Sequence, residues 1–247
     1  GRFANDDLTP ALLDAGVPTV CLSFLIDHPR CCSVDCDNEQ GGYTAVRHLI
    51  NLGHKRIAFL YPGYGVSWGK ERHLGALRAM AEAGLSSRNL ICYDWAETSL
   101  PSRLWVESAL EFLRTLKPRP TALVCCDESR AQGLVEALPQ VGMRAPDDLA
   151  VVGFNSTEIS ARCRPPLTSV HQPLEEIGAA AVGLLIRRIQ GEQSEERCLR
   201  FAMRMDVRDS CGGKSREEGV LPASVVDTAD LEVRPQAVVR HSGRLAV

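Results

Sequence analysis

Apolar residues along this chain follow two spacings that alternate from one segment to the next. Continuous apolar runs at residues 57–61, 121–126 and 149–154 are typical of strands that are covered on both faces. Between these runs, apolar residues recur every three or four positions, as they do along one face of a helix. Strands that alternate with helices predict an α/β fold, with a parallel sheet between two layers of helices.

The same pattern predicts the remaining elements. Further strands are expected at residues 17–22, 32–36, 90–93, 167–170 and 199–207, and helices at residues 9–16, 38–52, 67–84, 106–116, 131–138 and 173–190. From residue 212 onward no period is sustained, and turn-forming residues lie among charges of both signs. We therefore expect a mostly disordered tail over residues 212–247.

The segment from residue 37 to residue 60 contains the first candidate for a ligand contact. Asn38 can cap the predicted helix, and Gly53 has the conformational freedom to end it. Asp37 then stands where the preceding strand ends. Because open α/β sheets bind ligands at the carboxyl ends of their strands, this carboxylate is a candidate contact, although it could also serve as a helix cap.

Composition narrows the class of protein. Of the 247 residues, 45% are hydrophobic and 5% are aromatic, as in ordinary globular proteins. The formal net charge is −3, so the chain as a whole has no excess of positive charge that would indicate nucleic-acid binding. No apolar run is long enough to span a membrane, and no secretory signal is visible at the start. The chain begins with Gly1 rather than Met, so we expect an upstream segment.

Ten cysteines are scattered through the sequence without a paired C-x-x-C motif. A metal site formed by His28, Cys31, Cys32 and Cys36 is an alternative that these spacings support weakly. We favour the simpler interpretation that the cysteines are small buried apolar residues in a reducing cytoplasm. No metal or other cofactor is therefore predicted.

One motif suggests an enzyme. Residues 65–69 match the G-x-S-x-G pattern of serine hydrolases, and Asp127 and His171 follow Ser67 in the hydrolase order. However, residues 62–65 separate the strand from Ser67, so the strained turn that exposes the nucleophile would have to form inside a loop. No His-Gly-Gly segment is present for an oxyanion hole. A hydrolase that uses Ser67 stays a minor alternative, and no catalytic residue is predicted.

A second group of residues favours binding over catalysis. Polar and aromatic side chains follow the predicted strand ends, which a parallel sheet brings to one crevice. They are Asp37, Trp68, Arg72, Trp95, Asp127 and Asn155. Carboxylate and guanidinium groups bind neighbouring hydroxyls through charge-assisted hydrogen bonds, and an indole offers a flat apolar face to a sugar ring or a base. Such a site needs no proton abstraction, so it is predicted to bind a ligand.

Each of these residues also has a structural interpretation. Arg72 lies early in its helix, against the helix dipole, which favours a bound partner over a solvated position. Trp95 could belong to the core, but its polar neighbours favour a half-exposed platform at least as much. Asp127 is explained more simply as the N-cap of the following helix. His54 and His171 are expected to be structural.

Several motifs occur in a fixed order along residues 8–211. They are Asp37-Asn38 with Gly41-Gly42 and residues 48–59; Arg72-x-x-Gly75; Pro120-Thr121-Ala122 with Asp127, Ala131 and Gly133; residues 146–154; residues 165–173 with Gly178 and Ala181; and Val207-Arg208-Asp209-Ser210. In this combination they resemble the effector-binding domain of the LacI/GalR family of transcription regulators.

The resemblance implies two Rossmann-like subdomains with parallel sheets, joined by three crossovers, as in type I periplasmic binding proteins. The expected N-subdomain comprises residues 1–61 and 171–191, and the expected C-subdomain comprises residues 62–170 and 192–211. The resemblance places effector contacts on Asp37, Arg72, Trp95 and Asn155. Cys126 replaces a usual Asn and Asn155 a usual Asp, so the hydrogen bonds to the effector are expected to differ from the family pattern.

The predicted protein is thus the effector-sensing and dimerising domain of a cytoplasmic LacI/GalR-type regulator. Its expected partners are a small-molecule effector (most simply a sugar), operator DNA through a headpiece that is not in this chain, and a second copy, with no membrane. The predicted ligand contacts are Asp37, Trp68, Arg72, Trp95, Cys126 and Asn155. A periplasmic sugar-binding protein, which shares the fold, is the principal alternative.

Overall fold

The computed structural model describes residues 8–24, 28–95, 102–192 and 198–213. Nearly all of the predicted tail and residues 1–7 lie outside this part of the chain. The strands are β1 (Val20–Leu22), β2 (Cys32–Cys36), β3 (Ile57–Tyr61), β4 (Leu90–Asp94), β5 (Ala122–Cys125), β6 (Ala150–Asn155), β7 (Thr168–His171), β8 (Cys198–Phe201) and β9 (Arg204–Asp206). The helices are α1 (Leu8–Asp14), α2 (Asn38–Asn51), α3 (Ser67–Glu82), α4 (Ser102–Thr115), α5 (Glu128–Ala137), α6 (Glu158–Arg162) and α7 (Leu174–Ile189).

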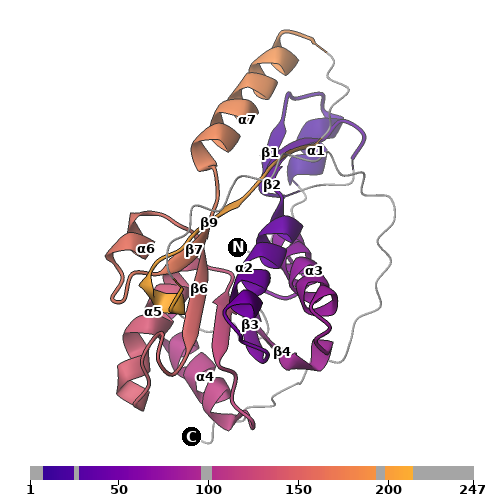
Figure 1. The fold of residues 1–247 in the computed structure, drawn as a ribbon. Helices are drawn as coiled ribbons and strands as arrows, with labels where there is room; N and C mark the ends of the chain where they lie inside the picture. The colour runs from indigo at the N-terminus through magenta and orange to yellow at the C-terminus, as the bar shows by residue number, and fades with distance from the viewer. Residues whose placement is uncertain (1–7, 25–27, 96–101, 193–197, 214–247) are drawn as a thin grey trace, which may run out of the picture.

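The described strands form two sheets, which confirms the predicted α/β architecture (Figure 1). The smaller sheet has the order β1-β2-β8, and we call it, with α1 and α7, the small unit. The larger sheet has the order β4-β3-β5-β6-β7-β9, and we call it, with α2 to α6, the large unit. All strand pairs are parallel except β7 with β9.

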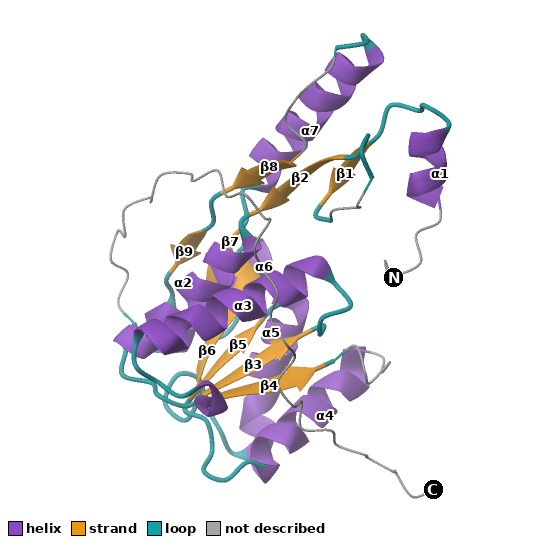
Figure 2. Ribbon diagram, turned by 90° about the vertical axis from the view of Figure 1, so that its right-hand side faces the viewer, coloured by secondary structure: helices purple, strands orange, loops and turns teal. Residues whose placement is uncertain are grey.

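Over the described residues, the chain passes between the two units at three places: after β2, after β7 and after β8 (Figures 1 and 2). This changes the predicted subdomain boundaries. β3 pairs with β4 and β5 in the large sheet, whereas the sequence interpretation had residues 57–61 in the first subdomain. β8 pairs with β2 in the small sheet, although residues 192–211 were expected in the other subdomain. The apolar pattern identifies a strand, but it carries no information about the sheet that the strand joins.

The expected last strand, residues 199–207, is divided into β8 and β9, which belong to different sheets. The break occurs at the crossover, where the main-chain N–H of Met203 donates to the side-chain oxygen of Gln40 at 2.9 Å. β9 then pairs antiparallel with β7. The sequence of residues 199–207 indicates one continuous strand because β8 and β9 are both extended. The pattern therefore does not reveal that the chain leaves one sheet for the other between them.

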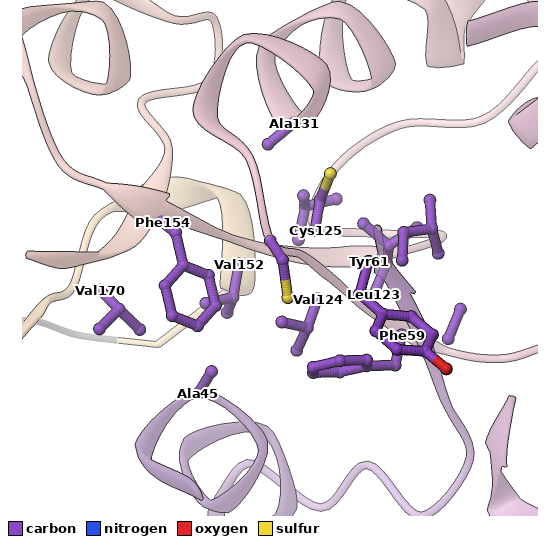
Figure 3. Close-up of a cluster of buried hydrophobic side chains, with 14 of the residues drawn as sticks. Ala45, Phe59, Tyr61, Leu123, Val124, Cys125, Ala131, Val152, Phe154 and Val170 are labelled. Carbon is purple, nitrogen blue, oxygen red and sulfur yellow. The ribbon is translucent and has the colours of Figure 1, made fainter. Parts of the chain in front are cut away.

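The large sheet is buried on both faces. Phe59, Val124, Val152 and Phe154 are each 0% exposed. Figure 3 shows Ala45 of α2 on one side of these strands and Ala131 of α5 on the other. Burial of such a sheet on two sides explains its near-continuous apolar sequence. Among the described helices, none has both the length and the apolar character that a membrane crossing would require.

Helices α2 and α3 approach each other closely, and two glycines make this possible. A Cβ atom at Gly42 would overlap the main-chain carbonyl of Arg72, and one at Gly75 would overlap the main-chain carbonyl of Glu39. The neighbouring atoms are backbone, so they cannot move aside as a flexible side chain could. This approach brings the side chain of Arg72 within reach of the first turn of α2.

Candidate functional site

Arg72 is the centre of the candidate site, and its side chain is almost fully enclosed at 4% exposure. Its Nε donates to Oδ1 of Asn38 at 3.0 Å, and its Nη1 donates to the main-chain oxygen of Cys126 at 2.9 Å. The guanidinium carbon lies 4.7 Å from the ring centre of Trp68 and 4.1 Å from that of Phe154. Burial lowers the pKa of this guanidinium from its ordinary value. The cation is thus oriented by neutral hydrogen-bond acceptors and aromatic rings.

Asn38 connects Arg72 with the end of β2. Besides accepting from Arg72, it donates through Nδ2 to Oδ2 of Asp35 at 3.2 Å and to the main-chain oxygen of Cys36 at 3.3 Å. Oδ1 of Asp35 accepts from the main-chain N–H of Cys36 at 2.7 Å. Burial raises the pKa of Asp35, which favours the neutral acid. The amide of Asn38 therefore joins the small unit to the large unit beside the candidate site.

Asp37, the predicted contact on the small unit, caps α2. Its Oδ1 accepts from the main-chain N–H of Gln40 at 2.9 Å, so Asp37 rather than the predicted Asn38 is the N-cap. Its own main-chain N–H donates to the oxygen of Phe201 on β8 at 2.8 Å. Capping uses one carboxylate oxygen and leaves the second oxygen for another donor.

Trp68 and Cys126 also lie at this site, but they contribute in different ways. Trp68 precedes Arg72 by four residues on α3, so the two side chains share one helix face. Cys126 accepts from Arg72 through its main-chain oxygen, and its thiol is a further hydrogen-bond partner of Arg72. Burial raises the pKa of its thiol to about 12, so the thiol is neutral at ordinary pH. Phe154, which the sequence indicated as core, completes the aromatic enclosure of the guanidinium.

Trp95 belongs to a neighbouring aromatic cluster, and of its two predicted positions, core or half-exposed platform, the structure shows the core. It is 8% exposed and meets Trp105 of α4 edge-on, with 5.8 Å between ring centres. The guanidinium carbon of Arg130 lies 4.8 Å from the ring of Trp95 and 5.3 Å from that of Trp105. The polar residues beside Trp95 suggested that its ring is exposed to solvent, but Trp105 of α4 and Arg130 of α5 pack against the ring.

Asn155 and Asp127 end their strands as expected. Asn155 has a positive φ of 84°, and its Oδ1 accepts from Nε2 of Gln172 at 2.7 Å, which leaves its own amide N–H groups as donors. Asp127 accepts from the main-chain N–H of Arg130 at 2.9 Å, which confirms its predicted role as the N-cap of α5. Asn155 is thus a second neutral hydrogen-bonding group beside Phe154.

The residues of the hydrolase alternative do not form a triad. Ser67 begins α3, and no hydrogen bond joins it to His171 or Asp127 within the described residues. Nδ1 of His171 instead lies 3.6 Å from Oδ2 of Asp206. The chain therefore lacks the base–nucleophile contact that would activate Ser67.

The clustered cysteines lie in the small unit. Cys31 Sγ is 3.6 Å from Cys21 Sγ, and Cys32 Sγ accepts from Arg188 of α7 at 2.6 Å. Cys36 is 1% exposed at the end of β2. Within the described part of the chain, no group of three or more potential ligands is arranged to hold a metal ion. All ten cysteines are free thiols.

Sequence reasoning missed several groups that complete the site. Asn38 appeared as a helix cap and Phe154 as core, and Asp35 lay inside a predicted strand. An ion pair between Glu71 of α3 and Arg200 of β8 was also unforeseen; its two N–O distances are 2.9 and 3.0 Å. Only Asn38 had a local signal, because it directly follows the candidate Asp37.

Two α/β units that are joined by three crossovers, with polar groups gathered where the chain passes between them, define a periplasmic-binding-protein-like fold. Comparison with known proteins agrees. Residues 46–211 match the family of periplasmic binding protein-like domains. The chain belongs to this family, and it corresponds to the effector-binding domain of the LacI-family transcription regulators.

Its curated relatives include transcriptional repressors. The chain is 31% identical over 210 residues to the HTH-type transcriptional repressor PurR of Photobacterium profundum, a match that covers 83% of this chain and 61% of the relative. It is 32% identical over 208 residues to PurR of Vibrio cholerae, with 84% and 58% covered. The chain thus spans about 60% of the length of these relatives.

Solved structures show the same fold. The transcriptional regulator CelR in complex with cellobiose has a TM-score of 0.71 and 30% identity, over 83% of this chain and 62% of that one. A LacI-family transcriptional regulator from Enterococcus faecium with bound ribose has a TM-score of 0.74 and 26% identity, over 83% of this chain and 75% of that one. The similar proteins named here are transcription regulators rather than enzymes.

Proposed function

We propose that this chain is the effector-sensing domain of a LacI/GalR-type regulator and that it binds a small polyhydroxylated ligand, most simply a sugar, between its two units. The observation that carries the proposal is the position of Arg72. Its guanidinium is held by Asn38, Trp68 and Phe154 at the carboxyl ends of the strands, beside the first crossover. Ligands of open α/β sheets bind at such strand ends.

The ligand contacts that we propose are those expected from the sequence. Asp37 accepts hydroxyl groups from the small unit, while Arg72 and Asn155 donate from the large unit and Trp68 supplies an apolar face. Trp95 and Cys126 take part if the ligand displaces the present packing around them. The cellobiose and ribose complexes of similar regulators support a carbohydrate ligand.

Binding between the units would change their relative angle, because contacts to both units favour one arrangement over the others. In the full-length protein, a cytoplasmic homodimer in this proposal, the change would alter operator binding through a DNA-binding headpiece. Coupling of this kind amounts to about 1–3 kcal/mol, or roughly 5- to 150-fold in DNA affinity.

A periplasmic sugar-binding protein remains the competing proposal. The ten free thiols favour a reducing compartment, since oxidising compartments promote disulfide formation. The sequence upstream of the chain discriminates between the two: a helix-turn-helix supports the regulator, and a secretory signal supports the periplasmic protein.

Isothermal titration of the chain with a panel of mono- and disaccharides tests the site. We expect at least one saturable ligand, whose binding is lost in Arg72→Met. Arg114→Met is the matched control, because this arginine is exposed on α4 and pairs with Glu111. Unchanged affinity in Arg72→Met, with the fold intact by circular dichroism, would contradict the assignment of the site.

A further inference from the structure

Two cysteines of the small unit face each other at short range. Sγ of Cys31 lies 3.6 Å from Sγ of Cys21, and both side chains are 3% exposed. Cys21 is the middle residue of β1, and Cys31 directly precedes β2, which pairs parallel with β1. With Leu13 of α1 and Phe24, the two thiols form a small apolar cluster that is separate from the main core. The pair is therefore a feature of the small unit, apart from the candidate ligand site.

Other thiols of the chain contact groups with which no disulfide can form. Cys92 Sγ lies 3.1 Å from Nε2 of His73, and the exposed Cys198 accepts from the hydroxyl of Ser33 at 3.3 Å. The first contact joins a thiol to an imidazole and the second joins a thiol to an alcohol. The contact in the small unit differs from these because both of its partners carry sulfur.

The surrounding backbone allows the two sulfurs to come into bonding distance. A disulfide has an S–S length of about 2.05 Å, so the sulfurs must approach each other by roughly 1.5 Å. Cys31 lies in a turn, where its main-chain N–H donates to the oxygen of His28 at 3.0 Å. The ladder of β1 with β2 begins one residue later, at Val20 and Cys32. The turn can therefore move toward Cys21 without breaking a strand pairing.

We propose that Cys21 and Cys31 are a redox-active dithiol, a site at which peroxides oxidise the chain reversibly. The inference does not depend on the proposed carbohydrate ligand. It fits a reducing compartment, where protein thiols stay reduced until an oxidant reaches them. A peroxide is small enough to enter a buried site when the turn before β2 opens locally.

The reaction consumes one peroxide and yields two waters. The first thiol attacks one oxygen of hydrogen peroxide; the O–O bond breaks, the thiol proton joins the departing hydroxide as water, and a sulfenic acid forms. The second thiol then attacks the sulfenic sulfur; the S–O bond breaks, the disulfide forms and the second water leaves. Two sulfurs are oxidised and the peroxide oxygens are reduced. Small thiols reverse the step by thiol–disulfide exchange.

Arg188 connects this dithiol with α7. Its Nη2 donates to the main-chain oxygen of Arg30 at 2.8 Å, and its Nη1 donates to Sγ of Cys32 at 2.6 Å. The two contacts therefore lie immediately on either side of Cys31 in the sequence. When Cys31 moves toward Cys21, the groups that hold the end of α7 move with it. Oxidation would thus change the packing of α7 as well as link the turn to β1.

Peptide mapping of the unmodified chain by mass spectrometry tests the proposal. The chain is treated with increasing amounts of hydrogen peroxide, its remaining thiols are alkylated, and it is digested with trypsin without reduction. Trypsin cleaves after Arg30, so a bond between Cys21 and Cys31 joins peptides 3–30 and 31–47. We expect this linked pair to be the main disulfide product and to separate into its two peptides after treatment with dithiothreitol.

Variants locate the bond, because the second peptide also contains Cys32 and Cys36. Cys31→Ser should lower the yield of linked peptides by about tenfold or more, since it removes the sulfur within reach of Cys21. Cys36→Ser is the matched control: its thiol is also buried, at 1% exposure, and its loss should leave the yield unchanged. Fragment-ion spectra assign the bonded sulfur in the unmodified chain, so the test holds even if Cys31→Ser fails to fold.

Three results would overturn the proposal. The first is the absence of linked peptides at a peroxide dose that already oxidises the exposed Cys198, which reports that the oxidant has acted. The second is a bond that starts from Cys32 or Cys36, or that is formed equally well in Cys31→Ser. The third is a linked product that dithiothreitol does not separate.

Discussion

Arg200 and Glu71 form a two-pronged ion pair that joins the small unit to the large unit. Nη1 of Arg200 donates to Oε2 of Glu71 at 3.0 Å, and Nη2 donates to Oε1 at 2.9 Å. Arg200 lies on β8 and Glu71 on α3, directly before Arg72. The side chains are 20% and 24% exposed, so solvent screens the pair only in part. The contact therefore holds the two units together beside the candidate site.

We expect this ion pair to contribute measurably to the free energy of unfolding. Glu71→Gln and Arg200→Gln should each destabilise the chain, and a double-mutant cycle should give a coupling energy of about 1–2 kcal/mol. The matched control is Glu158 with Arg162, whose side chains are 82% and 80% exposed. A cycle on that pair, measured by urea unfolding, should show no coupling. Equal coupling in both cycles would contradict the assigned role.

The close crossing of α2 and α3 predicts a large effect of one added methyl group. Gly75→Ala would force a Cβ against the main-chain carbonyl of Glu39, so we expect a loss of about 1–3 kcal/mol in the free energy of unfolding. Gly178→Ala is the control: this glycine lies in α7 with open space around its Cβ position. There, alanine should be neutral or stabilise by up to about 1 kcal/mol. If Gly75→Ala is tolerated equally well, the crossing is looser than described.

Burial of His73 should make stability depend on pH in the acidic range. Its Nδ1 lies 2.6 Å from the Tyr64 hydroxyl and its Nε2 3.1 Å from Cys92 Sγ, and burial lowers its pKa from 6.5 to about 4. As the pH falls from about 6.5 to about 4, the unfolded chain binds a proton that the folded chain excludes. The free energy of unfolding should therefore fall across this range, by up to about 3 kcal/mol from this residue.

Urea titrations at several pH values, on the unmodified chain and on His73→Phe, would measure this contribution. The variant removes the titrating ring but keeps an aromatic group beside Tyr61, whose ring centre is 5.0 Å from that of His73. The decline between about pH 6.5 and 4 should be smaller in the variant. The same slope in both proteins would show that His73 is not the titrating group.

Asn38 should be more sensitive to truncation than an asparagine at the other end of the same helix. Asn38→Ala leaves Arg72 Nε and Asp35 Oδ2 without their partner, so we expect a loss of about 1–3 kcal/mol in the free energy of unfolding. Asn51→Ala, at the exposed end of α2, should change stability by less than about 0.5 kcal/mol. Comparable losses at both positions would show that the contacts of Asn38 contribute little.

The sequence predicted those parts of the site that depend on local geometry. Asp127 was expected to cap α5 because its type and its place after a strand suffice for that role. Trp68 and Arg72 were both predicted as ligand contacts within one helix, and their spacing of four residues is enough to place them on one face of it. The partners of Arg72 could not be derived this way. Asn38 and Cys126 lie 34 and 54 residues away, and only packing brings them together.

The alternation of apolar runs with helical spacing by itself determined that this chain is an α/β protein, because each period is a property of one element and its exposure. The tertiary structure decided which sheet each strand joins. β3 and β8 therefore appear in sheets that the pattern did not predict, and one extended segment serves two sheets. It also buried Trp95 and bonded Arg72 to neutral groups of Asn38 and Cys126, with no carboxylate among the described residues bonded to it. Burial and charge pairing depend on residues that are distant in sequence, so no local pattern encodes them.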